Sequence, residues 1–109
     1  MTVRFLSCAE RELAEAVEFY DGERPGLGGE FLSEVRRTLA RVGRYPNAWP
    51  ALSRRARRCL VSRFPYGVIY QVRSDCILVV GIMHLKCDPK RWQDRLAEAV
   101  DDPEPPPIE

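Results

Sequence analysis

The chain has 109 residues, of which 45% are hydrophobic and 30% are charged, and its net charge at pH 7 is +1. This length allows one globular domain with a single core, and the composition excludes a disordered chain. The longest apolar run, 77–83, is far too short for a membrane span, and no secretory apolar segment opens the sequence, so we expect a cytoplasmic protein without a membrane partner.

The N-terminal half predicts a short strand followed by a helical hairpin. The strand is expected at 3–6, and Ser7 with Glu10 three residues later has the spacing of a capping box at a helix start. The segment 21–29, rich in Gly and Pro, predicts the turn between two helices, and the second helix should end near 45–46. Each helix has an apolar stripe, formed by Ala9, Leu13, Ala16, Val17 and Tyr20 in the first and by Phe31, Val35, Leu39 and Val42 in the second. These stripes need a sheet face to cover.

Residues 57–84 predict three consecutive strands. The segment 66–73 alternates between two faces, so we expect one of its faces to be better buried than the other. The segment 77–83 is almost wholly apolar, which predicts a central strand covered on both faces. Ser74–Asp75 predicts a short turn and therefore an antiparallel hairpin, and Pro65 suits a corner before that hairpin.

The C-terminal part predicts one more helix and a tail. Asp88–Pro89 suits the start of a short helix with Trp92 on its buried face, and 102–109, with four Pro and three acids, should be a disordered tail. The predicted fold class is therefore α+β. We expect an antiparallel sheet, made of a short N-terminal strand and three consecutive C-terminal strands, packed against the helical hairpin within a single domain at 1–101.

Positive charge is concentrated in the middle of the chain. Residues 35–74 contain ten Arg and no Asp or Glu, whereas the rest of the chain carries all 16 acids. The densest part is the cluster Arg54, Arg55, Arg57 and Arg58. Such a cluster is either a solvated loop or a surface for an anionic partner, which would be a nucleic acid or an acidic protein.

Four segments occur in order along the chain: ELAEAVEFY at 12–20, RPGLGGEF at 24–31, RFPYGVIYQV at 63–72 and HLKCDPKRW at 84–92. Together they resemble the ParE/RelE superfamily of toxins from type II toxin–antitoxin systems, and the ParE side in particular. The resemblance implies a small α+β toxin whose groove is filled by the extended C-terminal segment of a cognate antitoxin. It also implies one of two activities, since ParE-like members inhibit DNA gyrase and RelE-like members cut mRNA on the ribosome.

The residue at position 67, which is Gly67, helps to distinguish between these two activities. In RelE-like relatives the equivalent residue is commonly an Arg that faces the active site, whereas Gly67 supplies no cation and leaves the sheet surface open. RNA cleavage through a 2′-hydroxyl needs a general base, a general acid and cations, for which the candidates are Arg63, Arg73, His84 and Lys86. His84 is the one that titrates near neutrality, and it is either catalytic or a structural or target-contacting histidine that bonds the following turn.

These observations favour a toxin that acts by binding rather than as an enzyme. Its expected partners are a cognate antitoxin, in a hetero-oligomer, and DNA gyrase, with the ribosome and its mRNA as the alternative target. A non-toxic member that only binds antitoxin is a third interpretation. We expect no cofactor and no metal site. The residues predicted to contact the antitoxin or the target are Arg54, Arg55, Arg57, Arg58, Arg63, His84 and Trp92.

Overall fold

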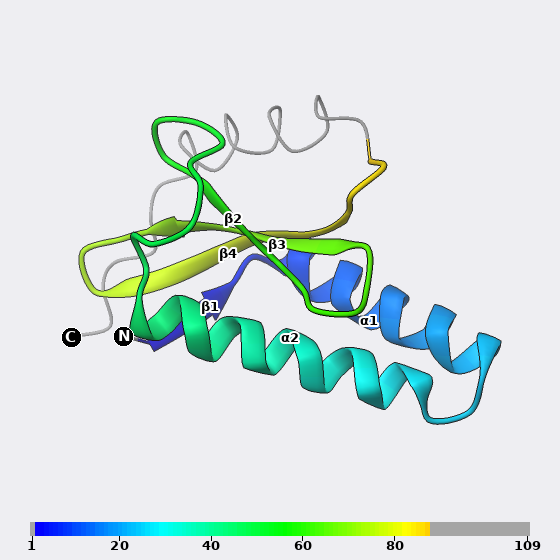
Figure 1. Ribbon diagram of the computed structural model, residues 1–109. Helices are drawn as coiled ribbons and strands as arrows, with labels where there is room; N and C mark the ends of the chain where they lie inside the picture. Colours follow the sequence, from blue (N-terminus) through cyan, green and yellow to red (C-terminus); the bar gives the residue numbers. More distant parts are fainter. Residues whose placement is uncertain (1, 88–109) are drawn as a thin grey trace.

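The computed structural model describes residues 2–87, in which two helices pack on one face of a four-stranded sheet (Figure 1). In chain order the elements are β1 (Thr2–Phe5), α1 (Ser7–Glu23), α2 (Leu27–Arg44), β2 (Arg57–Leu60), β3 (Tyr66–Val72) and β4 (Cys76–His84). The predicted α+β fold, with its helical hairpin and four strands, is confirmed. The predicted C-terminal helix with Trp92 and the predicted tail at 102–109 lie outside the described residues. Within 2–87, neither helix is long and apolar enough to cross a membrane.

The sheet has the strand order β1-β4-β3-β2 and is mixed. The pairs β2–β3 and β3–β4 are antiparallel, as predicted, but β1 runs parallel to β4. The expectation of a wholly antiparallel sheet is therefore wrong at this one pair. Short turns force β2, β3 and β4 to alternate in direction, whereas a whole helical hairpin separates β1 from the other strands and leaves its direction free.

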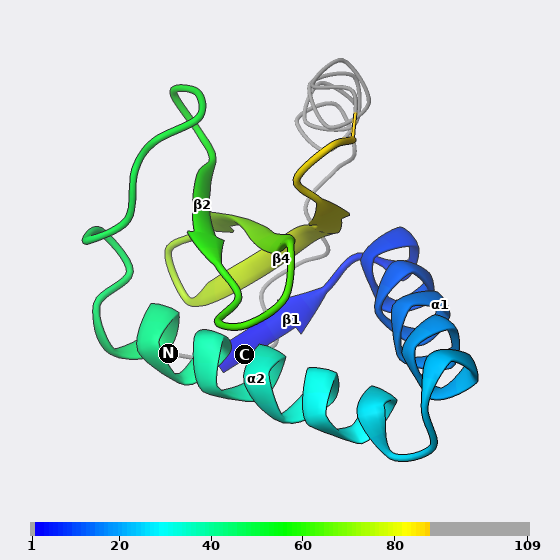
Figure 2. The same cartoon turned by 45° about the vertical axis from the view of Figure 1, so that its right-hand side comes forward.

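The main core lies between the helices and the sheet, on what we call the helix face (Figure 2). Phe31, Val35 and Val42 of α2 have no exposed surface, so the predicted stripe of the second helix is confirmed; Leu39 is partly buried beside them. Aromatic rings extend this core, with centroid separations of 4.9 to 6.1 Å among Tyr20, Phe31, Phe64 and Tyr66. Most of these pairs meet edge-on and Tyr20–Phe31 is tilted, and such aromatic contacts add about 0.5–1.5 kcal/mol per pair beyond burial.

The opposite face of the sheet, which we call the loop face, is also covered. Ile69 of β3 is 1% exposed and packs with Ala56, Val80 and Met83, with Leu52 partly buried beside them. The loop that follows α2 folds back here, held by hydrogen bonds from the N–H groups of Leu52 and Ser53 to the carbonyl of Ala56. The expected two-sided burial of β4 is confirmed, whereas the one better-buried face expected for β3 is wrong because this loop shields its second face.

The helical hairpin is tighter than predicted. Helix α1 continues to Glu23, so only 24–26 remain as the turn in place of the predicted 21–29. The Asp21 carboxylate accepts the N–H of Gly28 at 2.8 Å, which satisfies a donor in the first turn of α2. The predicted capping box is wrong, since α1 begins at Ser7 and its N-cap, Leu6, has no side-chain cap. The end of α2 at Arg44 is as predicted.

Close contact between α1 and α2 predicts different effects for two neighbouring glycines. Gly28→Ala should lower the free energy of unfolding by about 1–3 kcal/mol, because the added Cβ would collide with the backbone oxygen of Val17. Gly29→Ala is the matched control, since its Cβ would meet nothing within 4 Å, and it should be neutral or stabilising by up to about 1 kcal/mol. Urea denaturation measures both changes. Equal stability of the two variants would contradict the packing described.

Tyr70 joins the centre of the sheet to the end of α2. Its side chain has no exposed surface, and its hydroxyl donates to the carbonyl of Pro46 at 2.7 Å. Burial raises the pKa of Tyr70 to about 12, and the nearby Cys59 adds to the rise. The folded protein therefore holds the Tyr70 proton more tightly than the unfolded chain does.

This raised pKa predicts a loss of stability at alkaline pH. The stabilisation by neutral Tyr70 is complete below about pH 10 and is lost as the pH rises toward about 12. Tyr70→Phe should cost about 1 kcal/mol at neutral pH through the lost hydrogen bond, but it cannot ionise. The stability gap between wild type and Tyr70→Phe should therefore shrink between about pH 9 and pH 11. A gap that stays constant in urea titrations over this range would contradict the assignment.

Candidate functional site

The four clustered arginines do not form one surface. Arg54 and Arg55 lie exposed in the loop before β2, and Arg57 and Arg58 are consecutive residues of that strand. Successive side chains of a strand point to opposite faces of its sheet. Arg57 lies opposite Tyr70 on the helix face, so Arg58 points to the loop face. Strand alternation thus divides the cluster between two environments.

A hollow of about 360 Å³ lies at the end of the sheet where β2 begins and β3 ends. We call it the arginine hollow. Among residues 2–87 its lining includes four arginines and no acid; these lining residues are Asn47, Ala51, Ser53, Arg54, Arg55, Ala56, Arg57, Gln71, Val72 and Arg73. The Arg57 Nη1 donates to the carbonyl of Trp49 at 2.7 Å, and this contact fixes one guanidinium in the wall.

Gln71 is the buried polar side chain of the hollow, with an exposed fraction of 3%. Its Oε1 accepts hydrogen bonds from Nε of Arg73 at 3.1 Å and from Nη2 at 2.7 Å, which sets the orientation of the amide. Its Nε2 is buried and has no hydrogen-bond partner within residues 2–87. Gln71 was not predicted as a candidate from the sequence. A lone amide in an otherwise apolar central strand was the available signal.

Arg58 covers Gly67 on the loop face. A Cβ placed on Gly67 would lie 2.9 Å from both Cγ and Cδ of Arg58 and 3.8 Å from Cδ2 of Leu85. The expectation that Gly67 leaves the sheet surface open is therefore wrong, since the stem of an arginine from the next strand fills the space. Leu60, which pairs with Gly67, is 53% exposed, and Leu85 is 44% exposed. A cation and two exposed leucines thus lie together on this face.

Arg63 is bound to α2. Its Nη2 lies 2.9 Å from Oε1 of Glu30, and its Nη1 lies 3.5 Å from Oε2 of the buried Glu34. The hydrogen bond from Arg63 lowers the pKa of Glu30, and the same bond raises the pKa of Arg63. Arg63 also has a φ of 72°, a left-handed conformation that costs a side-chain-bearing residue about 1–2 kcal/mol. These contacts fasten the turn between β2 and β3 to the helical hairpin.

His84 lies at the end of β4 and bonds the turn that follows. Its Nδ1 accepts the backbone N–H of Lys86 at 3.0 Å, and its ring meets Tyr66 edge-on at a centroid distance of 5.2 Å. The neutral ring therefore carries its proton on Nε2. Arg73 lies beyond the opposite end of β3, about 20 Å away by the rise of a strand. The structure thus brings His84 and Lys86 together but keeps Arg73 apart, and Trp92 lies outside the described residues.

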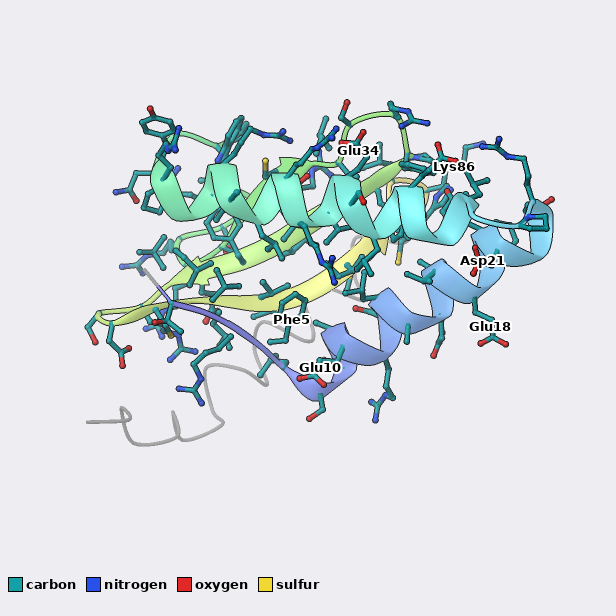
Figure 3. All side chains as sticks on the ribbon, turned by 90° about the horizontal axis from the view of Figure 1, so that it is seen from below. Phe5, Glu10, Glu18, Asp21, Glu34 and Lys86 are labelled. Carbon is teal, nitrogen blue, oxygen red and sulfur yellow. The ribbon has the colours of Figure 1, made fainter. Side chains whose placement is uncertain are left out.

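A second recess, with a volume of about 650 Å³, was not predicted from the sequence. Figure 3 labels four of its lining residues, Phe5 at the end of β1 and Glu10, Glu18 and Asp21 on α1. Leu13, Ala14, Val17 and Leu32 supply its apolar wall. The recess with Glu10, Glu18 and Asp21 and the arginine hollow have no lining residue in common. Acidic and basic side chains are therefore segregated in the structure as they are in the sequence.

A family model described as "ParE toxin of type II toxin-antitoxin system, parDE" matches residues 3–89. The chain belongs to the ParE toxin family. Among solved structures, it is similar to a chain of the chromosomal ParDE toxin–antitoxin system from P. aeruginosa, with a TM-score of 0.68, 15% identity, and coverage of 77% of this chain and 95% of that chain. At this identity the likeness establishes the fold. No curated protein matches the chain significantly.

Membership of the ParE family makes the chain a ParE-type toxin of a type II toxin–antitoxin system. The matched range contains the arginine hollow, Arg58 on the loop face, Arg63 and His84. Family membership applies to the domain as a whole and does not choose among these positions. Their roles are proposals that follow from the contacts of each side chain.

The contacts of Arg63 predict a stability test. Arg63→Ala should lower the free energy of unfolding, because it breaks the pair with buried Glu34; the Cβ at positive φ is kept, so the backbone strain stays as in the wild type. Arg63→Gly should be less destabilised, by about 1 kcal/mol, because glycine tolerates this φ. Arg37→Ala is the control: it removes an exposed partner of the same carboxylate and should change stability by less than about 0.5 kcal/mol. Arg63→Gly no more stable than Arg63→Ala in urea denaturation would contradict the strained turn.

Proposed function

We propose that this ParE-family toxin acts by binding DNA gyrase in the cytoplasm and is neutralised by a cognate antitoxin in a hetero-oligomer. The proposal deepens the family assignment with a mode of action and with partners. The observation that carries it is the separation of the polar groups that RNA cleavage would need.

Cleavage of RNA requires a general base, a general acid and a cation within hydrogen-bonding reach of one phosphate. In the described part of the chain, Arg73 and His84 lie at opposite ends of the β3–β4 hairpin. Arg63 at the His84 end is bound to two glutamates of α2. Gly67, at the position where RelE-like relatives commonly have a cation, is covered by the stem of Arg58. These placements favour a toxin that binds its target without cutting RNA.

We assign the loop face around Arg58 to the antitoxin. An acidic segment with apolar side chains complements a guanidinium beside two exposed leucines, Leu60 and Leu85. β2 is also the edge strand of the described sheet; its first half is already paired with the loop through the Arg58 N–H and the Pro50 carbonyl, so a further chain would pair with the part of β2 beyond Arg58. The antitoxin segment would therefore gain charge pairing, apolar contacts and backbone hydrogen bonds from one short strand.

The mode of action has a direct biochemical test. Purified toxin should inhibit supercoiling of relaxed plasmid by gyrase, should leave ribosome-bound mRNA intact, and should lose its effect when the antitoxin is added. Cleaved mRNA with unaffected supercoiling would contradict the proposal, and loss of that cleavage in His84→Ala would establish the enzymatic alternative. Expression that does not slow growth would instead favour the non-toxic interpretation.

The antitoxin surface predicts a charge-reversal effect. Arg58→Glu should weaken the toxin–antitoxin complex and make its affinity less dependent on salt, because an attractive pair becomes repulsive. Arg36→Glu, which places the same charge change on the exposed surface of α2, is the control and should have a small effect. Calorimetric titration at several salt concentrations measures both. Equal affinity and salt dependence for Arg58→Glu and wild type would exclude this surface.

A further inference from the structure

We infer that the arginine hollow is a binding site for a phosphate group, supplied either by a nucleic-acid backbone or by a free nucleotide. This inference goes beyond the proposed function and does not depend on gyrase being the target. It rests on the donors that converge in the hollow and on a buried amide that has no partner.

Guanidinium groups reach the hollow from separate segments of the chain. Arg54 and Arg55 come from the loop, Arg57 from the start of β2, and Arg73 from the end of β3. Within residues 2–87, no carboxylate forms an ion pair with Arg54, Arg55 or Arg57. Guanidinium groups present planar pairs of N–H donors that match the oxygens of an oxyanion. The charge and geometry of the hollow therefore select an anion.

The Gln71 amide adds a fixed neutral donor. Its oxygen is already bound to Arg73, so its orientation is set and Nε2 is the end left without a partner. A buried donor without an acceptor costs about 1–3 kcal/mol, so a shift of the Gln71 side chain that let Nε2 meet an anion oxygen in the hollow would be favoured. This amide distinguishes the hollow from a solvated patch of arginines.

Phosphate fits this donor set better than the carboxylate of a protein partner. A phosphate presents oxygens in several directions and can accept from arginines on different walls, whereas a carboxylate is satisfied by one guanidinium fork. A protein segment would also need an apolar anchor. In the described part of the chain, the apolar residues that line the hollow are Ala51, Ala56 and Val72, whereas the exposed leucines Leu60 and Leu85 lie on the loop face.

The test measures binding of the full chain to a short fluorescein-labelled DNA duplex by anisotropy at several salt concentrations, with ATP and inorganic phosphate as competitors. Arg54→Gln/Arg55→Gln should weaken duplex binding at least about tenfold and reduce the salt slope by about one to two. Arg11→Gln/Arg36→Gln removes the same charge from exposed helix positions outside the hollow and should weaken binding by no more than about threefold.

The variant Gln71→Glu distinguishes a loss of phosphate binding from a loss of folding stability. It keeps the acceptor for Arg73, removes the unpartnered N–H and adds a negative charge in the hollow, so it should abolish phosphate binding without loss of stability. Competition by ATP and phosphate would identify a site open to free nucleotides, and competition by unlabelled duplex alone would identify a nucleic-acid site. Hollow variants that bind duplex and ATP like the matched control would overturn the inference, as would a glutamate-rich peptide that binds the hollow when no phosphate probe does.

Discussion

The central strands β3 and β4 must be covered on both faces, and the positions of the charged groups depend on how this is achieved. The helical hairpin covers one face with apolar stripes, and the loop after α2 covers the other with Leu52 and Ala56. Backbone hydrogen bonds hold that loop, including one from the N–H of Arg58 to the carbonyl of Pro50. An arginine-rich segment is therefore fixed against the end of the sheet because its apolar residues are needed to bury a strand.

This constraint gives each cation a different environment. Arg57 and Arg58 are neighbours in sequence, but the pleat of β2 places one beside Trp49 and the other above Gly67. Arg63 is held by the glutamates of α2, which leaves it little freedom to meet a ligand. A basic segment that looks uniform in sequence is thus divided into a donor-rich hollow, a mixed apolar and cationic face, and a structural ion pair.

Gly67 connects the fold to the proposed mode of action. A larger residue there would displace the stem of Arg58, because an added Cβ already lies 2.9 Å from two of its carbons. Position 67 can therefore either carry a side chain of its own or, as a glycine, be covered by the stem of Arg58 from β2. The second arrangement presents a cation beside Leu60 and Leu85, which suits recognition of a protein segment better than acid–base chemistry.

The sequence by itself determined the α+β class, the helical stripes, the β3–β4 hairpin and the ParE resemblance, because periodicity and turn residues are local signals. It could not give the parallel pairing of β1, which depends on a strand distant in sequence, or the second cover of β3, which depends on how a loop folds back. The candidate site was predicted only in part. Arg54, Arg55 and Arg57 were found by charge, but their meeting with Gln71 and their separation from Arg58 were decided by the tertiary structure, since strand alternation and loop packing set which side chains share a space.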